Sequence, residues 1–75
     1  MSERICLQHV DESRNMRRFY VLDIQPNLFG EWVLVRENGR IGSPGRVIEK
    51  VFNCPVEAQR RFAQLMREKT RKGYQ

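Results

Sequence analysis

The sequence predicts an α+β fold, in which a small twisted antiparallel sheet of about four strands packs against one C-terminal helix. Three observations support this fold class. Apolar and polar residues alternate through much of the chain before residue 54, polar or glycine-containing segments separate these stretches, and a helical period begins at Val56. Because 75 residues suffice for one core only, we expect a single domain over residues 1–75.

The first two strands are predicted on either side of a polar turn. Residues 4–10 alternate in character, and residues 11–15 form a polar cluster. Residues 19–24 then bring aromatic and β-branched side chains at strand spacing. This pattern predicts a hairpin. The expected core side chains of its second strand are Tyr20, Leu22 and Ile24.

The third and fourth strands follow a short connector over residues 26–30. Residues 31–37 form the clearest strand pattern in the chain, and residues 47–53 form the fourth. The segment from Glu37 to Arg46 contains three glycines and a proline, so we expect the backbone to reverse there. Short connections between all four strands predict an antiparallel meander.

A helix is predicted to run to about Arg71, with Pro55 in its first turn, where a missing N–H costs nothing. Gly73 is expected to cap it, and Tyr74 to fold back on the core. At 100° per residue, the apolar stripe is Ala58, Phe62, Leu65 and Met66. The opposite stripe, expected to face solvent, is Arg60, Gln64, Arg67 and Arg71.

The composition favours an anionic partner. The formal net charge is +5 and the pI is about 9.9, which attract anions at long range. No apolar run is long enough for a membrane span, and the start lacks a secretory signal, so we expect a cytoplasmic protein. In that compartment Cys6 and Cys54 are expected to be buried structural residues.

Catalytic chemistry finds little support. A chain of 75 residues has little room to line a deep cavity. Its one histidine, His9, has no nucleophile or carboxylate at a recognisable spacing. His9, Cys6 and Cys54 supply only three metal ligands and no Cys-x-x-Cys pair. We therefore expect that the protein is not an enzyme and that it binds no metal and no cofactor.

The candidate binding surface is the segment from Glu37 to Arg46 and the strand before it. Glycines with positive φ can direct backbone N–H groups toward an anion, and arginines can bind phosphates with two donors. The alternative is a solvated hairpin end, partly neutralised by Glu31 and Glu37. The predicted nucleic-acid-binding residues are Arg36, Asn38, Gly39, Arg40, Gly42, Ser43, Gly45, Arg46 and Lys50.

Other aromatic and basic groups are less specific. Tyr20 and Trp32 are expected in the core rather than stacked on bases, since so small a protein needs large side chains to fill its interior. A further basic group at the first hairpin contains Arg14, Arg17 and Arg18. Whether the helical stripe of Arg60, Arg67 and Arg71 contributes to binding is left open.

Residues 29–46 resemble the signature of WGR domains. Residues 18–22 resemble the second strand of that family, and residues 58–62 and 69–74 its closing helix and tail. The resemblance implies the same sheet and helix. It also implies DNA contact, since the similar domain of DNA-damage-responsive poly(ADP-ribose) polymerases contacts DNA near strand breaks. The chain resembles the free-standing bacterial kind, usually described as nucleic-acid-binding.

One residue departs from the family signature. The tryptophan that gives the family its first letter is replaced by Asn38, while Gly39 and Arg40 are kept. Stacking of that tryptophan on a terminal nucleotide sugar is therefore lost. Asn38 is expected either to hydrogen-bond a phosphate or base edge, or to occupy the left-handed position of an Asn-Gly turn. The resemblance assigns Arg40 a contact with a phosphate or a partner's carboxylate.

The leading hypothesis is a small module that binds the DNA phosphate backbone without sequence specificity. The alternative is a protein-interaction module that docks an acidic partner surface, and RNA is a third candidate ligand. A preference for DNA ends and the oligomeric state are left open.

Overall fold

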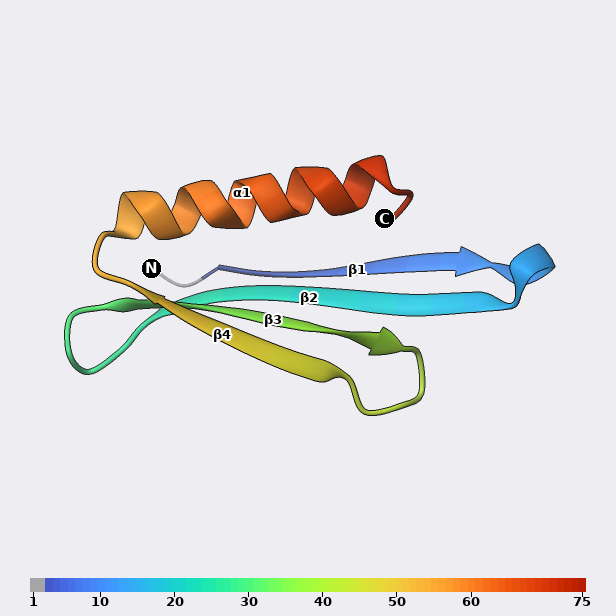
Figure 1. Ribbon diagram of the computed structural model, residues 1–75, viewed down its shortest axis with the longest axis horizontal. Coiled ribbons are helices and arrows are strands. Elements are labelled where there is room, and N and C mark those ends of the chain that lie inside the picture. Colours follow the sequence, from blue (N-terminus) through green and yellow to red (C-terminus); the bar gives the residue numbers. More distant parts are fainter. Residues whose placement is uncertain (1–2) are drawn as a thin grey trace.

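The structure, a computed structural model, describes residues 3–75, so the first two residues of the expected domain lie outside the described residues. Four antiparallel strands form one sheet in the order β1-β2-β3-β4, followed by one helix (Figure 1). The elements are β1 (Glu3–Asp11), a 3-10 turn η1 (Glu12–Arg14), β2 (Met16–Pro26), β3 (Trp32–Arg40), β4 (Arg46–Phe52) and α1 (Pro55–Arg71). The predicted α+β fold class and meander are confirmed.

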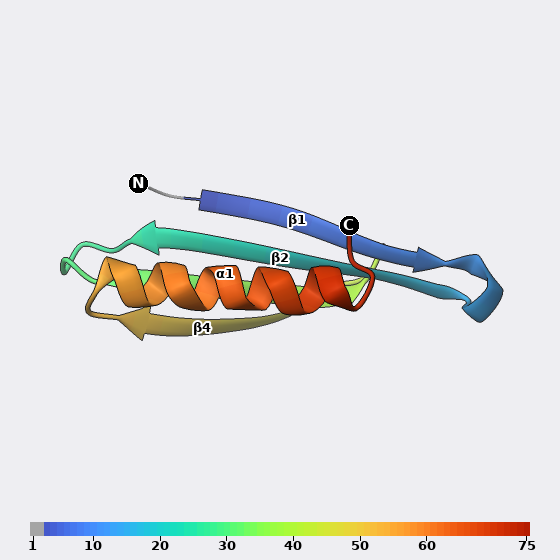
Figure 2. The ribbon, with the colours of Figure 1, turned by 90° about the horizontal axis from the view of Figure 1, so that it is seen from above.

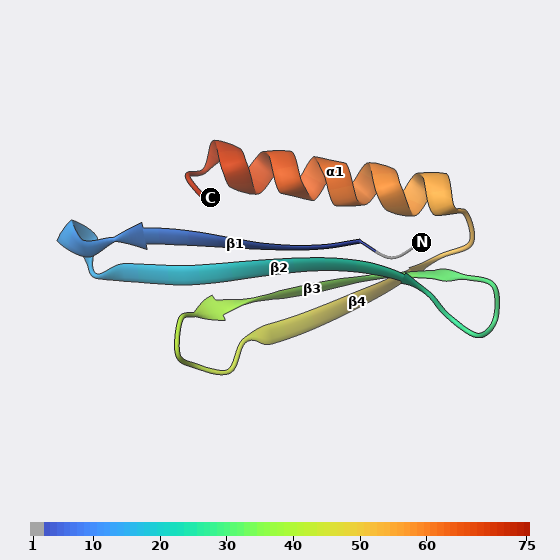
Figure 3. The ribbon, with the colours of Figure 1, turned by 180° about the vertical axis from the view of Figure 1, so that it is seen from behind.

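The helix covers one face of the sheet, and no element within residues 3–75 covers the other face (Figures 1 and 3). We call these the helix face and the helix-free face. Helix α1 packs on β2, β3 and β4. Figure 2 shows it running along the sheet between β2 and β4, while the end of the β1–β2 hairpin extends beyond its C-terminal turn. Part of the helix face is therefore uncovered near that turn.

The core lies between α1 and the middle of the sheet. Tyr20, Leu22 and Ile24 all have less than 3% of their surface exposed, as their spacing in β2 predicts. The helix contributes the predicted apolar stripe, of which Met66 is only partly buried. Trp32, expected in the core, is only partly buried and packs against the edge of the core. The remaining buried residues are Leu34, Ala58, Phe62, Leu65 and Tyr74.

The helix-free face carries half-exposed apolar side chains, among them Val47 and Val51. Cys6 lies on this face and is exposed, so the prediction that it is buried is wrong. The alternation in β1 is correct, but nothing in the sequence says that this face lacks a covering layer. Cys54 is half-buried at the N-cap of α1, and both cysteines are free.

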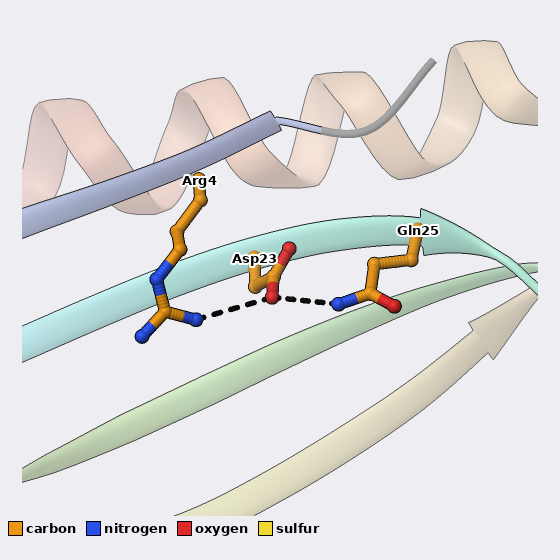
Figure 4. Close-up of polar contacts among 3 residues, drawn as sticks. All are labelled: Arg4, Asp23 and Gln25. Atoms are coloured by element: carbon orange, nitrogen blue, oxygen red, sulfur yellow. Dashed lines mark hydrogen bonds and ion pairs between the residues drawn. The ribbon is translucent and has the colours of Figure 1, made fainter.

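A polar cluster sits among these apolar residues. Asp23 is only 8% exposed. Its carboxylate accepts hydrogen bonds from Arg4 Nη1 at 3.2 Å and from Gln25 Nε2 at 2.8 Å. Figure 4 shows Asp23 between these two partners. Because a buried carboxylate is costly unless it is paired, Arg4 and Gln25 make its position on the sheet tolerable.

Strand β3 runs further than its pattern predicts. It continues to Arg40, so the reversal is confined to residues 41–45 and does not span 37–46. Asn38 lies within the strand, opposite Tyr20 and Arg46, and has no positive φ. The alternative that placed Asn38 in a left-handed Asn-Gly turn is therefore wrong.

Gly39 and Gly45 are needed for close packing rather than for positive φ. A Cβ on Gly45 would lie 2.7 Å from Phe19 Cζ and 2.8 Å from the Asn38 carbonyl oxygen, and one on Gly39 would lie 3.0 Å from Gly45 Cα. These separations are shorter than van der Waals contact. The Phe19 ring thus packs over both glycines, which the alternation of polar and apolar residues does not reveal.

The C-terminus of α1 is fixed by the predicted glycine cap. Gly73 has φ +104°, and the N–H groups of Gly73 and Tyr74 donate to the carbonyls of Thr70 and Lys69 at 3.1 and 3.0 Å. This is a Schellman motif. Tyr74 then turns back and is 9% exposed, with its ring centroid 5.3 Å from that of His9. The predicted return of Tyr74 to the core is confirmed.

Candidate nucleic-acid interface

Five of the predicted binding residues lie on the helix face. Alternation along β3 places Arg36, Asn38 and Arg40 on that face, because Asn38 is the cross-strand partner of the buried Tyr20. On β4, Arg46 pairs with Asn38, and Lys50 pairs with the buried Leu34. The sheet therefore brings these charged side chains to the same face as the helix.

A groove runs along the seam between α1 and the β3–β4 half of the sheet. Three adjoining hollows form it: the first and second share Arg36 and Arg61, and the second and third share Asn38 and Lys69. Its cationic lining comes from β2, β3, β4 and α1. We call it the basic groove, and its cations are Arg18, Arg36, Arg40, Lys50, Arg61, Lys69 and Lys72.

The cations of the groove form no ion pairs within residues 3–75. The three ion pairs of that part of the chain are Arg4–Asp23, Arg14–Asp11 and Arg17–Glu12, all elsewhere. Neither Glu31 nor Glu37 pairs with the cations of the groove. Glu37 lies on the helix-free face, opposite Val21 and Val47, and Glu31 accepts a hydrogen bond from Asn27.

The pKa of Lys69 is lowered by its burial and by the positive charge around it. Burial lowers it first, and the neighbouring Lys72 ammonium lowers it further. Arg36 and Arg18 act in the same direction, while Glu68 opposes them. The Lys69 ammonium lies 4.7 Å from the Tyr20 ring centroid and 5.3 Å from that of Tyr74, so two aromatic faces hold the charge in place.

Arg40 is held against the first hairpin. Its guanidinium donates to the backbone oxygen of Asn15 at 3.3 Å and to the side-chain oxygen of that residue at 3.4 Å. Asn15 can meet it because it adopts a left-handed conformation, with φ 52°, at the end of η1. Arg18 pairs across the strands with Arg40. Two arginines thus lie together where the helix leaves the sheet uncovered.

The turn over residues 41–45 differs from the predicted row of outward N–H groups. Of its glycines only Gly42 has positive φ, at +90°. The N–H groups of Ile41 and Ser43 donate to backbone oxygens of Arg17 and Arg40 at 2.9 and 3.0 Å. Gly42 and Ser43 are exposed at the tip, and neither lines the hollows of the groove.

The basic group predicted at the first hairpin is divided by the structure. Arg14 and Arg17 pair with acidic residues, whereas Arg18 belongs to the groove. The helical stripe of Arg60, Arg67 and Arg71 is exposed, and none of its members lines the groove.

Sequence reasoning missed the helical contribution to the groove. Arg61, Lys69 and Lys72 lie beside the apolar stripe of α1, not opposite it. Residues 61, 65, 69 and 72 recur at helical spacing, so these cations follow one edge of the stripe. That spacing is a usable signal, although it does not say which edge of the stripe meets β3 and β4.

No helix within residues 3–75 has the length and apolar character that crossing a membrane requires. Within the same residues, no three His, Cys, Asp or Glu side chains gather where they could hold a metal ion. Cys6 and His9 lie on opposite faces of β1 because they are three residues apart in one strand.

Comparison with known proteins places the chain. Residues 3–75 match the family model of the WGR domain. A relative from Sinorhizobium fredii (strain NBRC 101917 / NGR234), named "Uncharacterized protein y4dW", is 42% identical over 71 residues, which are 95% of this chain and 35% of the relative. The chain thus spans about a third of that relative's length. No solved structure matches the chain. With nearly all of its residues covered by the family model, the chain belongs to the WGR domain family.

Proposed function

We propose that this WGR domain is a binding module without catalytic activity, which holds DNA by its phosphate backbone without sequence specificity. WGR domains bind nucleic acid in poly(ADP-ribose) polymerases, which supports this ligand class. The observation that carries the proposal is the basic groove, whose cations come from three strands and the helix and form no ion pairs within residues 3–75.

The chemistry of the groove favours phosphates over bases. Guanidinium and ammonium groups bind phosphate oxygens, which carry no sequence information. Asn38 is the one side-chain amide in the groove lining, so there is little capacity to distinguish base edges. Arg40 lines the open end of the groove, where the helix does not cover the sheet. Arg46 lines none of the three hollows, but it lies beside Asn38 on the same face. We assign them the first contacts with the backbone.

The role of Asn38 follows from its position in β3. It lines two hollows of the groove on the helix face, where its amide can donate to a phosphate oxygen. It does not offer the flat aromatic surface of the family tryptophan. We therefore propose that this domain binds along duplex DNA and depends little on a free end.

Salt dependence is the test of this proposal. If four phosphates are neutralised, the slope of log K against log salt should be about −3.6 on duplex DNA, so raising salt from 0.1 to 0.4 M should weaken binding roughly 100-fold. Fluorescence anisotropy with a labelled blunt duplex measures this slope. RNA and single-stranded DNA of the same length serve as competitors.

The alternative ligand, an acidic protein surface, makes a different prediction. Binding to such a partner through apolar contacts at its centre should persist near 0.5 M salt, where the Debye length is about 4 Å. If the domain shows no salt-dependent affinity for any of the three nucleic acids, the proposed DNA function is wrong.

A further inference from the structure

The middle hollow of the basic groove has a volume of about 140 Å³ and is lined by Tyr20, whose hydroxyl is buried. We call it the Tyr20 pocket. Tyr20 is 2% exposed, yet its hydroxyl oxygen has no hydrogen-bond partner within residues 3–75. A buried hydroxyl without a partner is unusual, because its desolvation is not compensated. The charged residues that share the pocket with Tyr20 are Arg36, Arg61, Glu68, Lys69 and Lys72.

The neighbours of the hydroxyl explain why its proton has no acceptor. Burial raises the pKa of Tyr20, and the nearby Arg36 guanidinium acts in the opposite direction. It approaches the hydroxyl oxygen without reaching hydrogen-bond geometry. A guanidinium has donors only, and so does an ammonium. Arg36, even where it approaches the hydroxyl oxygen, cannot accept the proton. Glu68 is the one carboxylate in the pocket, and no hydrogen bond joins it to Tyr20.

We propose that the Tyr20 pocket is a site for one phosphate-type oxyanion, to which the Tyr20 hydroxyl donates a hydrogen bond. An oxyanion supplies an acceptor for the hydroxyl proton. Its negative charge is also complementary to the surrounding guanidinium and ammonium groups. The inference rests on the proposed function for its natural source, a backbone phosphate of bound nucleic acid, although free phosphate has the same chemistry.

Several side chains around the pocket are held in place by burial or by contacts within the protein. Tyr20 is held in the core, and Arg36 projects from the central part of β3. Arg61 donates to the side-chain oxygen of Gln64 at 2.9 Å, which leaves the rest of its guanidinium available. The Lys69 ammonium is fixed over the Tyr20 ring at 4.7 Å. One anion would therefore meet donors from both the sheet and the helix.

The test compares Tyr20→Phe with Tyr74→Phe. The second is a matched control. Tyr74 is a buried tyrosine that lines the adjoining third hollow but not the Tyr20 pocket, and phenylalanine keeps the ring that contacts Tyr20 and Lys69. NMR titration with inorganic phosphate, at ionic strength held constant with sodium chloride, gives the affinity. We expect saturable binding to wild type and Tyr74→Phe, and binding weaker by tenfold or more in Tyr20→Phe. Equal phosphate affinity in all three proteins overturns the inference.

Thermal unfolding provides a second readout. In phosphate-free buffer, Tyr20→Phe should be as stable as wild type or more stable, since it removes an unpaired buried hydroxyl. Added phosphate should raise the Tm of wild type more than that of Tyr20→Phe. A clear loss of stability in phosphate-free buffer would mean that the hydroxyl has a partner inside the protein, which also overturns the inference.

Duplex DNA separates this inference from the proposed function. If Tyr20→Phe weakens both phosphate and DNA binding, the pocket holds a backbone phosphate and both proposals stand. If phosphate binding depends on Tyr20 but DNA affinity does not, the pocket is a site for free phosphate and the proposed function is retained. If phosphate binding depends on Tyr20 and no DNA binds, the pocket is again a site for free phosphate, but the proposed function is wrong. If DNA binds while phosphate affinity ignores Tyr20, the pocket is wrong and the function is retained.

Discussion

Replacing both Arg40 and Arg46 by glutamate is expected to lower the affinity for duplex DNA by at least roughly 100-fold at 0.1 M salt. Each arginine loses a charge-assisted contact that contributes about 1.5–3 kcal/mol, and each glutamate adds repulsion. The slope of log K against log salt should also become shallower by the contribution of about two phosphate contacts. Fluorescence anisotropy across a salt series measures both effects.

The control for this variant is Arg60→Glu with Arg67→Glu. Both pairs of substitutions remove four units of charge from the formal net charge of +5, so the overall charge is identical. Arg60 and Arg67 are exposed on α1 outside the groove lining, and their replacement should weaken DNA binding only slightly. Equal losses in the two double variants would show that net charge, not the groove, attracts the DNA. Circular dichroism must show that both variants are folded.

Replacing Tyr74 by alanine is expected to lower the free energy of unfolding by about 3 kcal/mol. A 75-residue domain has roughly 4 to 11 kcal/mol in total, so this loss is large. Tyr74 fills the space beyond the end of α1, with its ring centroid 6.1 Å from that of Tyr20 and 5.3 Å from that of His9. Urea denaturation measures the change.

Two variants frame the Tyr74 result. Tyr74→Phe keeps the ring contacts and nearly conserves the side-chain volume. It should therefore lower the free energy of unfolding by less than about 1 kcal/mol. Leu28→Ala changes a side chain that is 99% exposed in the β2–β3 loop and should lie within about 0.5 kcal/mol of wild type. If Tyr74→Ala is no more harmful than Leu28→Ala, the C-terminal segment does not belong to the core.

The sequence predicts the fold well where periodicity decides it. Tyr20, Leu22 and Ile24 alternate in β2 and are buried, and the start of α1 follows from Pro55. The cap at Gly73 is equally local, because a glycine with positive φ after the last helical turn is a property of a few adjacent residues. These features need no knowledge of how the elements pack.

The failures occur where tertiary packing decides. Cys6 alternates as a strand residue should, but its burial depends on whether a second layer covers that face. Gly39 and Gly45 resemble turn residues, yet the Phe19 ring, twenty residues away from Gly39, requires the absence of their side chains. A strand can therefore pass through an Asn-Gly pair when a distant aromatic residue packs over it.

The candidate site divides in the same way. The arginines of β3 and β4 can be placed by alternation, and Arg36, Arg40 and Arg46 indeed share the helix face. The cations of the helix can be placed only when the packing of α1 on the sheet is known. Arg61 and Lys69 lie along one edge of the apolar stripe, and the sequence does not say which edge faces β3 and β4. Predicting the Tyr20 pocket needs both the alternation of the strands and the placement of the helix, since its lining combines a buried residue of β2 with one edge of α1.

The most direct test of the account is an NMR map of the DNA-binding surface. Backbone amide shifts are followed while unlabelled duplex DNA is titrated into labelled protein at 0.1 M salt. The largest shifts are expected to cluster in residues 36–46 and 68–73, at the open end of the basic groove. Strand β1 and the loop with Leu28 and Phe29 should change little. Shifts concentrated on that loop or on the helix-free face, with none along the groove, would contradict the proposed DNA-binding surface.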